Sequence, residues 1–412
     1  MKEKAIISLS YIKTFLKWIV ISVLVGAVGG AVGSLFHKSI DYVTELRQIN
    51  PGIIWLMPLG GVVIAVLYGI SGKRIDTNRV IESVRSEKDI PWFMAPLIFV
   101  GTVITHLTGG SAGREGAALQ LGGCIGYNMG RVMRLDSGNL HIIVMAGMSA
   151  VFTALFGTPL TAIFFALEVT SVGVMYYAGL LPCIISSLCA YFIASLSGNS
   201  PVQFSVTFPE ITAGILVKTV VLAILCAVIC ILFCASIQKG EHYAEKYIKN
   251  KYLRAMLGGA LLVVLTFALK TYDYNGAGMS VIENAMNGHA RYEAFLLKIL
   301  FTAITISAGF KGGEIVPAFF VGATFGCVVA PVLGLSPGVG AAIGFIALFC
   351  GVVNCPVASV LLAFEVFGAD SVLIFVLVCG VSYMMSGYCG LYKSQKILYS
   401  KLEAKYVNTN AK

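Results

Sequence analysis

Long apolar runs broken by glycine-rich segments constrain this chain more than any other feature. The stretches Trp18–Phe36 and Thr219–Ile237 contain no charged residue. Each is close to the ~20 residues that cross about 30 Å of hydrocarbon as a helix. Only 12% of the 412 residues are charged, whereas soluble domains carry roughly 25%. Backbone groups in lipid must be hydrogen-bonded within the chain, so the sequence predicts an all-α polytopic membrane protein and excludes a water-soluble fold.

The net charge of +9 lies mainly at the chain ends and in the loops. Lysines precede the first apolar run and follow the last one: Lys2, Lys4, Lys13, Lys17, Lys393, Lys396, Lys401 and Lys405. Positive flanks favour the cytoplasmic side. We therefore expect a multi-pass protein of the cell membrane with both termini in the cytoplasm. A nucleic-acid partner is not expected, because the chain has no long basic stripe with interleaved aromatic residues.

The sequence contains no motif typical of a metal site, a cofactor site or an enzyme active site. The eleven cysteines are scattered singly and form no CxxC pair, so they are expected to be small core residues rather than disulfides or metal ligands. The sequence also lacks HExxH, GxSxG and any His-Asp cluster. We therefore predict no cofactor, no metal site and no enzymatic activity.

Hydropathy and charge divide the chain into two membrane halves. Several apolar segments are too short to cross a bilayer upright, which is typical of transporters with broken and re-entrant helices. The first span is expected near residues 15–36. The tail is expected to hold no regulatory domain. The predicted segments are a cytoplasmic N-terminal segment (1–14), a first membrane half (15–236), a charged connection (237–254), a second half (255–392) and a short cytoplasmic tail (393–412).

Two blocks recur at a nearly constant separation. The block Gly157–Val169 resembles Asn354–Val366, with Pro356 and Glu365 in register 197 residues after Pro159 and Glu168. Glu115, which follows glycine-rich sequence, has a counterpart 199 residues later in Glu314. Agreement within two residues indicates one duplicated unit. Together with the short spans, it predicts an inverted-topology repeat of two related halves.

The first glycine-rich break, residues 109–116, is suited to hold an anion. It contains four glycines and ends in Gly113-Arg114-Glu115-Gly116, just before an apolar run. Glycine lets backbone N–H groups turn toward a ligand, and the start of a helix carries about half a positive charge. A carboxylate in such a site competes with the anion and leaves it on protonation. The alternative is an ordinary loop ion pair between Arg114 and Glu115.

The second break repeats this arrangement. Gly312-Gly313-Glu314 is followed by Ile315 and Val316, and Pro317 suits the opening turn of the next helix. An ionisable residue at membrane depth is by default a functional candidate. The alternative is that Glu314 simply pairs with Lys311 in the loop.

Three ordered motifs resemble the CLC family of anion channels and anion/proton antiporters, over roughly residues 15–400. The family's GREGP-type motif matches Gly113–Ala117, with alanine in place of proline. Its APLxGxxFxxE helix is similar to Thr158–Glu168, and its GxFxP-type motif is similar to Gly313–Pro317. The resemblance implies the CLC fold, a homodimer with one pathway per subunit, and gating by the glutamate at position 115.

The departures from the family pattern resemble its fluoride-exporting branch. No serine occurs in Gly72–Val80, where the family has an anion-coordinating one, and that branch replaces this region and carries GGE in the second break. The branch also lacks a proton glutamate after the Glu168 position, where this chain has Val169. Thr77 stands in place of the branch's methionine, with Asn78 beside it, and Val316 stands where a hydroxyl residue would suit an anion better.

The resemblance therefore implies a fluoride/proton antiporter that exports fluoride. A chloride/proton antiporter and a passive anion channel of the same fold are the alternatives. The implied partners are a small inorganic anion, protons and the lipid bilayer. Gating and proton coupling fall to Glu115 and Glu314. The implied anion-binding residues are Gly113, Arg114, Gly116, Gly313, Ile315, Val316, Tyr392, Thr77 and Asn78, with Tyr388 as the substitute for Tyr392. Glu168, Glu365 and His106 are open between proton relay and structural roles.

Overall fold

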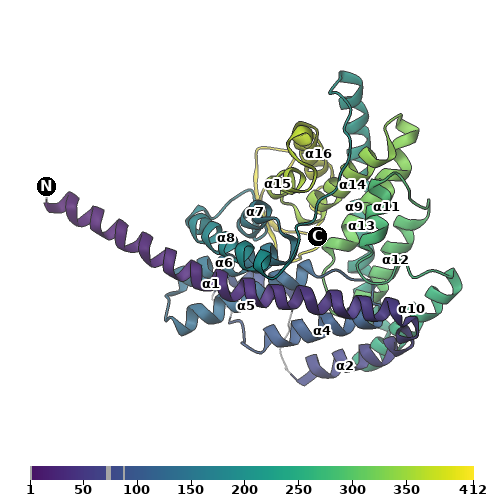
Figure 1. Cartoon of the computed structure of the whole chain (residues 1–412), viewed down its shortest axis with the longest axis horizontal. Helices are drawn as coiled ribbons and strands as arrows, with labels where there is room; N and C mark the ends of the chain where they lie inside the picture. Colours follow the sequence, from purple (N-terminus) through teal and green to yellow (C-terminus); the bar gives the residue numbers. More distant parts are fainter. Residues whose placement is uncertain (1, 71–75, 87–88) are drawn as a thin grey trace.

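The chain is largely helical in the computed structural model, which describes residues 2–70, 76–86 and 89–412, with side chains from Tyr11 onward (Figure 1). The expected segment around Gly72–Ile75 lies outside the described residues. The first half contains α1 (Lys2–Ile49), α2 (Met57–Ile70), α3 (Thr77–Ser83), α4 (Met94–Thr108), α5 (Glu115–Val132), α6 (Ser137–Phe156), α7 (Pro159–Glu168), α8 (Leu180–Leu196) and α9 (Ala213–Tyr247). The second half contains α10 (Lys251–Leu269), α11 (Met279–Met286), α12 (Ala294–Ser307), α13 (Ile315–Val329), α14 (Pro337–Val353), α15 (Pro356–Phe367) and α16 (Val372–Met385).

Both long and short apolar helices are present. Within the described residues, seven helices are long and apolar enough to cross a membrane, and others such as α4, α7, α12 and α15 are apolar but shorter. The polytopic, broken-helix fold predicted from the sequence is confirmed. Helix α1 continues past the expected end of the first span, residue 36, to Ile49. Helix α9 continues into the charged connection as far as Tyr247.

Glycine and proline set the helix breaks. Gly109 ends α4 and Gly309 follows α12, with φ of 95° and 96°, a left-handed conformation that glycine adopts without a steric penalty. Proline opens both α7 and α15, at Pro159 and Pro356. Proline fits the first turn because its missing N–H would have no partner there.

The two halves meet at the centre of the repeat. Gly113 and Gly313 form an isolated antiparallel bridge, in which each N–H donates to the other's carbonyl oxygen at 2.7 Å. The structural repeat there is 200 residues, since α5 begins at Glu115 and α13 begins at Ile315. Pairing the two glutamates at 199 residues is therefore wrong by one position. Glu314 is the counterpart of Arg114, not of Glu115.

The glutamates Glu168 and Glu365 cap helices of the opposite half. The Glu168 carboxylate accepts hydrogen bonds from the N–H groups of Val357 (3.3 Å) and Ala358 (3.0 Å) at the start of α15. Glu365 accepts from the Leu160 and Thr161 N–H groups, both at 2.8 Å, at the start of α7. These carboxylates satisfy amides that have no partner within their own helix. This exchange ties the halves together and gives both residues a structural role.

Glycines also bring helices of one half into backbone contact. A Cβ built on Gly122 of α5 would lie 2.3 Å from the Gly147 carbonyl oxygen of α6. The corresponding Cβ on Gly322 of α13 would lie 2.1 Å from the Gly344 carbonyl oxygen of α14. No side chain fits at these positions. The repeated glycines therefore allow α5 to pack closely on α6, and α13 on α14.

The tail folds back as a small sheet, which the sequence did not predict. Strand β2 (Lys396–Tyr399) pairs in parallel with β1 (Ser171–Val172), which follows α7, and antiparallel with β3 (Tyr406–Asn410). The buried Gln395 side chain donates to the carbonyl oxygens of Val169 (3.0 Å) and Val353 (2.8 Å). The tail is therefore attached to the ends of α7 and α14.

Candidate functional site

Two cavities lead to the glycine-rich breaks, called here the first cradle (residues 109–116) and the second cradle (residues 309–318). A cavity of about 420 Å³, the Glu115 cavity, is lined by Glu115, Arg114, His106 and Val316 together with residues of α1 and of the segment 272–280. A cavity of about 110 Å³, the Glu314 cavity, is lined by residues of α3, α4, α5, α9, the second cradle and the chain around Tyr392. The two cavities share no lining residue.

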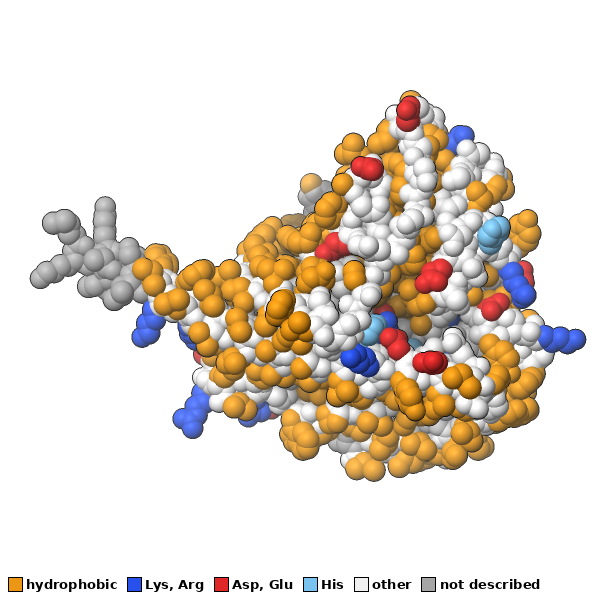
Figure 2. Space-filling model, in the orientation of Figure 1, with side chains coloured by type: hydrophobic (Ala, Val, Ile, Leu, Met, Phe, Trp, Pro, Cys, Tyr) orange, Lys and Arg blue, Asp and Glu red, His pale blue; other side chains and the backbone are white. Residues whose placement is uncertain are grey.

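The face of the molecule displayed in Figure 2 is mostly apolar. Figure 2 shows hydrophobic side chains over much of the displayed face, with charged and histidine side chains gathered around a hollow near its centre. A membrane protein needs an apolar exterior, so charge is expected only at loops or in water-filled cavities.

Reciprocal hydrogen bonds fix the cradles against each other. The Ser111 N–H donates to Thr305 Oγ1 at 3.0 Å, and the Lys311 N–H donates to Thr105 Oγ1 at 3.1 Å. With the Gly113–Gly313 bridge, these bonds hold the starts of α5 and α13 next to each other. The N–H groups of Gly113 and Gly313 are used in the bridge, so an anion here would use amides in the first helical turns.

The Glu115 carboxylate is buried where the two helix starts meet. Its side chain is 2% exposed, and Oε2 accepts a hydrogen bond from the Arg114 N–H at 3.0 Å. The Val316 backbone amide, at the start of α13, also interacts favourably with it. A Cβ on Gly113 would lie 2.6 Å from Oε2. Glycine at 113 therefore leaves the room that the carboxylate occupies.

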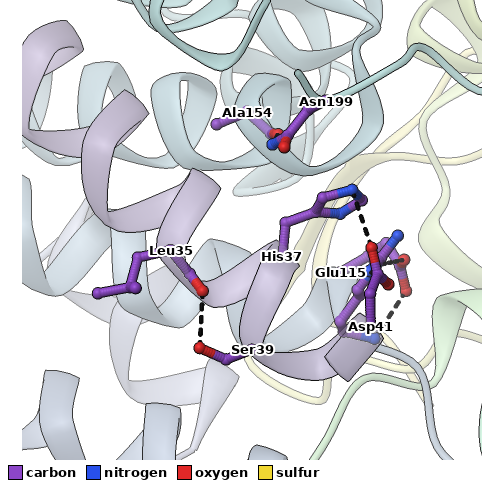
Figure 3. Close-up of polar contacts among 8 residues, drawn as sticks. Leu35, His37, Ser39, Asp41, Glu115, Ala154 and Asn199 are labelled. Atoms are coloured by element: carbon purple, nitrogen blue, oxygen red, sulfur yellow. Dashed lines mark hydrogen bonds and ion pairs between the residues drawn. The ribbon is translucent and has the colours of Figure 1, made fainter. Parts of the chain in front are cut away.

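A chain of charged groups connects Glu115 to α1 (Figure 3). The Arg114 guanidinium lies 3.9 Å from Glu115 Oε1 and donates to Asp41 Oδ1 at 2.6 Å. Asp41 Oδ2 in turn lies 3.1 Å from His37 Nε2, one helical turn earlier. Arg114 is therefore not a simple loop partner of Glu115, because its stronger contact is with Asp41. No sequence pattern indicates this pair, since the first span was expected to end near residue 36.

The end of α4 and the first residues of the first cradle are hydrogen-bonded to α1 and to the segment after α10. Arg47 of α1 donates from Nη1 to the His106 carbonyl oxygen at 3.0 Å. Asn275 donates from Nδ2 to the Gly109 carbonyl oxygen at 3.0 Å, and the Gly276 N–H donates to the Gly110 carbonyl oxygen at 3.1 Å. His106 itself lines the Glu115 cavity, as expected of a residue just before the cradle.

Glu314 occupies a different environment. It is the residue before the first turn of α13, is partly exposed, and lines the Glu314 cavity. The charged groups that act on it are Lys311, Glu241 of α9 and Asp76 before α3. The Lys311 amine lies 4.7 Å from the centre of the Tyr68 ring. Lys311 is therefore shared between an aromatic ring and the carboxylates, and is not a dedicated partner of Glu314.

Three further sequence-predicted residues, Thr77, Asn78 and Tyr392, line the Glu314 cavity. Tyr392 is 2% exposed, and its Oη has no hydrogen-bond partner among the described residues. Thr77 Oγ1 accepts from Gln120 Nε2 at 2.8 Å, and Asn78 Oδ1 accepts from the Ser394 N–H at 2.9 Å. Tyr388, the substitute for Tyr392, hydrogen-bonds Ser400 Oγ at 3.1 Å in the tail and does not line this cavity.

Gly116 and Ile315 lie at the helix starts between the cavities. A Cβ on Gly116 would lie 3.0 Å from Gly313 Cα, so this glycine permits the close approach of the two cradles. Ile315 is fully buried as the first residue of α13. The structure thus gathers the predicted residues into two groups, one with Glu115, Arg114 and Val316 and one with Glu314, Thr77, Asn78 and Tyr392.

Several polar lining residues escaped the sequence analysis, among them Asp41, Thr102, Gln120 and Glu241. A signal existed for Thr102, because the pattern Thr102-Val-Ile-Thr105 recurs 200 residues later as Thr302-Ala-Ile-Thr305. All eleven cysteines are free thiols, as expected. Within the described part of the chain, no group of three or more His, Cys, Asp or Glu residues is arranged to hold a metal ion.

Comparisons with known proteins agree with this architecture. The sequence profile of the voltage gated chloride channel family matches residues 68–387. A "chloride/fluoride channel protein" of Pseudomonas syringae pv. tomato is 33% identical over 396 residues, which cover 93% of this chain and 87% of that protein.

Two solved structures share the fold. The structure described as a CLC-type fluoride/proton antiporter superposes with a TM-score of 0.88 at 31% identity, covering 92% of this chain and 98% of that one. A slow cyanobacterial Cl⁻/H⁺ antiporter superposes with a TM-score of 0.76 at 20% identity, covering 90% and 94%. With the paired cradles, the repeated helices and these matches, the chain belongs to the voltage gated chloride channel (CLC) family of anion transporters.

Proposed function

We propose that this transporter exchanges fluoride for protons and exports fluoride from the cell. The observation that carries the proposal is the pair of carboxylates, Glu115 and Glu314, at the adjoining starts of α5 and α13 with a separate cavity for each. Two protonatable groups on either side of one crossing point allow anion and proton to move in opposite directions. The similar proteins described as a chloride/fluoride channel protein and a fluoride/proton antiporter support fluoride as the anion.

Glu115 acts as the gate in this mechanism. As a carboxylate it occupies amides at the helix starts, where an anion would also bind. Protonation removes its charge and frees these amides. Fluoride and the ionised Glu115 therefore exclude each other, and each gating event transfers a proton.

Glu314 receives protons from the other cavity. Its carboxylate lies near Glu241, Asp76 and Lys311, so the cavity holds several charged groups beside it. Nearby negative charges favour proton uptake by a carboxylate. Glu314 thus supplies the second protonation site that coupled exchange requires.

Fluoride loses a strongly bound hydration shell on entering the protein, so it needs close donors. Tyr392 Oη has no partner in the described chain. The Thr77 oxygen already accepts a bond from Gln120, which leaves its O–H to donate. These hydroxyls lie in one small cavity and replace part of the lost hydration.

We further propose that the Glu314 cavity opens to the cytoplasm. It is lined by Gln238 and Glu241 near the end of α9 and by Lys393 of the tail. These positions adjoin the lysine-rich segments 239–254 and 393–405. Positive charge favours the cytoplasmic side, which supports cytoplasmic termini and fluoride export toward the Glu115 cavity. The family relationship supports a homodimer with one pathway per subunit.

Liposome efflux with a proton readout tests the function. Vesicles containing purified protein and fluoride are diluted into fluoride-free buffer, and external fluoride and internal pH are recorded together. We expect fluoride efflux to drive protons inward against their own gradient, with chloride transported much more slowly. Efflux without proton movement would identify a passive channel, and faster coupled chloride flux would identify a chloride/proton antiporter. Protein-free vesicles give the leak rate.

A further inference from the structure

The side chain of Thr102 on α4 is buried, and its hydroxyl makes no hydrogen bond within the described residues. The residue is 0% exposed, and Oγ1 has no hydrogen-bond partner within the described residues. Buried hydroxyls are nearly always paired, since leaving one unpaired destabilises the folded protein. Thr102 nevertheless lines the Glu314 cavity. A polar group kept unpaired beside a cavity is a candidate for a ligand contact.

The repeat supplies an internal reference for this position. Thr302 of α12, 200 residues later, is also fully buried, and its Oγ1 lies 3.0 Å from Ser111 Oγ of the first cradle. The surrounding backbone is equivalent, because Thr305 and Thr105 accept matching bonds from residues 111 and 311. The same threonine is therefore paired in one half and unpaired in the other.

The difference arises from the residue opposite. The counterpart of Ser111 is Lys311, whose stem packs against Gly101 and whose amine faces the Tyr68 ring. Lysine offers no hydroxyl to Thr102. The second cradle thus lacks a residue equivalent to Ser111, which pairs with Thr302 in the first cradle.

The cavity is small enough to bring Thr102 near any occupant. Its volume is about 110 Å³, about a quarter of that of the Glu115 cavity, so an occupant lies close to the side chains that line it. A second unpaired hydroxyl, Tyr392 Oη, lines the same space. Two hydroxyls without protein partners suit a small anion stripped of water.

We propose that Thr102 is an anion ligand, whose O–H donates to fluoride while the ion occupies the Glu314 cavity. The inference rests on the proposed function and adds a residue that contributes to anion selectivity. The donor must approach closely to stabilise the ion, so a small anion gains more from it than a larger one such as chloride.

Matched threonine variants test this role. Thr102→Val keeps the shape and removes the hydroxyl, Thr102→Ser keeps the hydroxyl, and Thr302→Val is the twin in the other half. Fluoride and chloride binding are measured by titration calorimetry on the detergent-purified protein, with the melting temperature and the fluoride dependence of liposome efflux recorded for each variant.

We expect Thr102→Val to weaken fluoride binding and raise the half-saturating fluoride concentration about tenfold, the effect of one hydrogen bond to a charged group. Its melting temperature should be unchanged or higher, because an unpaired hydroxyl is gone. Thr102→Ser should bind as the wild type does. Thr302→Val should bind fluoride normally but melt at a lower temperature, because Ser111 loses its partner.

Wild-type fluoride affinity in Thr102→Val would overturn the ligand role, and so would an equal loss of fluoride and chloride binding. If Thr102→Val folds poorly, Thr102→Ala provides the same comparison and must show the same loss. The proposed function fails separately, when the wild type itself neither binds fluoride nor couples its efflux to protons. In that case the Thr102 assignment falls with it.

Discussion

The first and second cradles share one backbone but not one set of side chains. Both begin with a left-handed glycine, both join the central bridge, and both lead into a helix. At the structurally equivalent positions, however, Arg114 corresponds to Glu314, and Glu115 corresponds to Ile315. One carboxylate is 2% exposed and held by amides, and the other is partly exposed among charged groups. The two carboxylates, offset by one residue in the repeat, therefore lie in unlike surroundings.

Removing the titratable group at Glu115 should separate the two sites most clearly. Glutamine imitates the protonated side chain but cannot release a proton, so Glu115→Gln should permit fluoride efflux while lowering coupled proton uptake at least tenfold. Simultaneous fluoride and pH recording in liposomes measures both. Proton uptake at the wild-type ratio would show that Glu115 is not the coupling gate.

The second carboxylate should give a smaller and different loss. Glu314→Gln removes the protonation site in the other cavity but leaves the Glu115 gate, so we expect fluoride and proton fluxes to fall together by about tenfold, about 1.4 kcal/mol in the barrier. The same liposome assay applies. A phenotype identical to that of Glu115→Gln would break the comparison, because the two carboxylates would then act as equivalents.

The contact between Asp41 of α1 and Arg114 should affect transport only through Glu115. Asp41→Asn keeps the shape but leaves the Arg114 charge without its partner at 2.6 Å. The guanidinium then acts more strongly on the Glu115 carboxylate and holds it in place. Exposed ion pairs contribute about 0.2–1 kcal/mol, so fluoride turnover should slow by about two- to fivefold. Initial efflux rates measure this effect.

The control for that variant is Glu45→Gln, on the exposed face of α1 one turn later. It should transport at the wild-type rate. Equal slowing by both variants would indicate a general charge effect near the cavity, and Asp41 would then have no specific action on the first cradle.

The crossed helix caps should behave alike, in contrast to the cradles. Glu168→Gln and Glu365→Gln each remove a carboxylate that accepts two helix-start amides. We expect each to destabilise the protein by about 0.5–2 kcal/mol, the range for a lost N-terminal cap, with proton coupling intact. Thermal unfolding in detergent and the liposome assay check the two parts. A coupling defect in either variant would assign it to the proton path.

The tail should give the smallest effect. Burial lowers the pKa of Lys401 to about 8 from 10.5. Its amine also donates to Ser386 Oγ at 3.2 Å. Between those two pH values the folded protein binds fewer protons than the unfolded chain, so stability rises with pH in this window. Relative to Lys401→Met, the wild type should gain about 1–2 °C in melting temperature between pH 7.5 and 9.5.

Lys405→Met, at an exposed position, is the control for this prediction. It should retain the wild-type pH slope. A Lys401→Met protein with that same slope would show that the tail carries no buried titrating amine.

Particular residues show how far the sequence could lead. Apolar runs, Pro159, Pro356 and the glycine clusters suffice for the broken helices, because span length and backbone freedom are local properties. The partners of Glu168 and Arg114 could not be predicted, since they come from helices roughly 190 and 70 residues away. The register of the repeat failed at one position because matching glutamates outweighed matching threonines, although Thr105 and Thr305 marked the true offset.

The crossed caps of α7 and α15 also bear on how the protein is made. A ribosome delivers the first half to the membrane long before Glu365 is synthesised. The N–H groups at the start of α7 therefore lack this hydrogen-bond acceptor until about 200 further residues have been translated. Domains generally fold as units during synthesis. Here neither half is a complete folding unit, and assembly of the pathway must await the end of the chain.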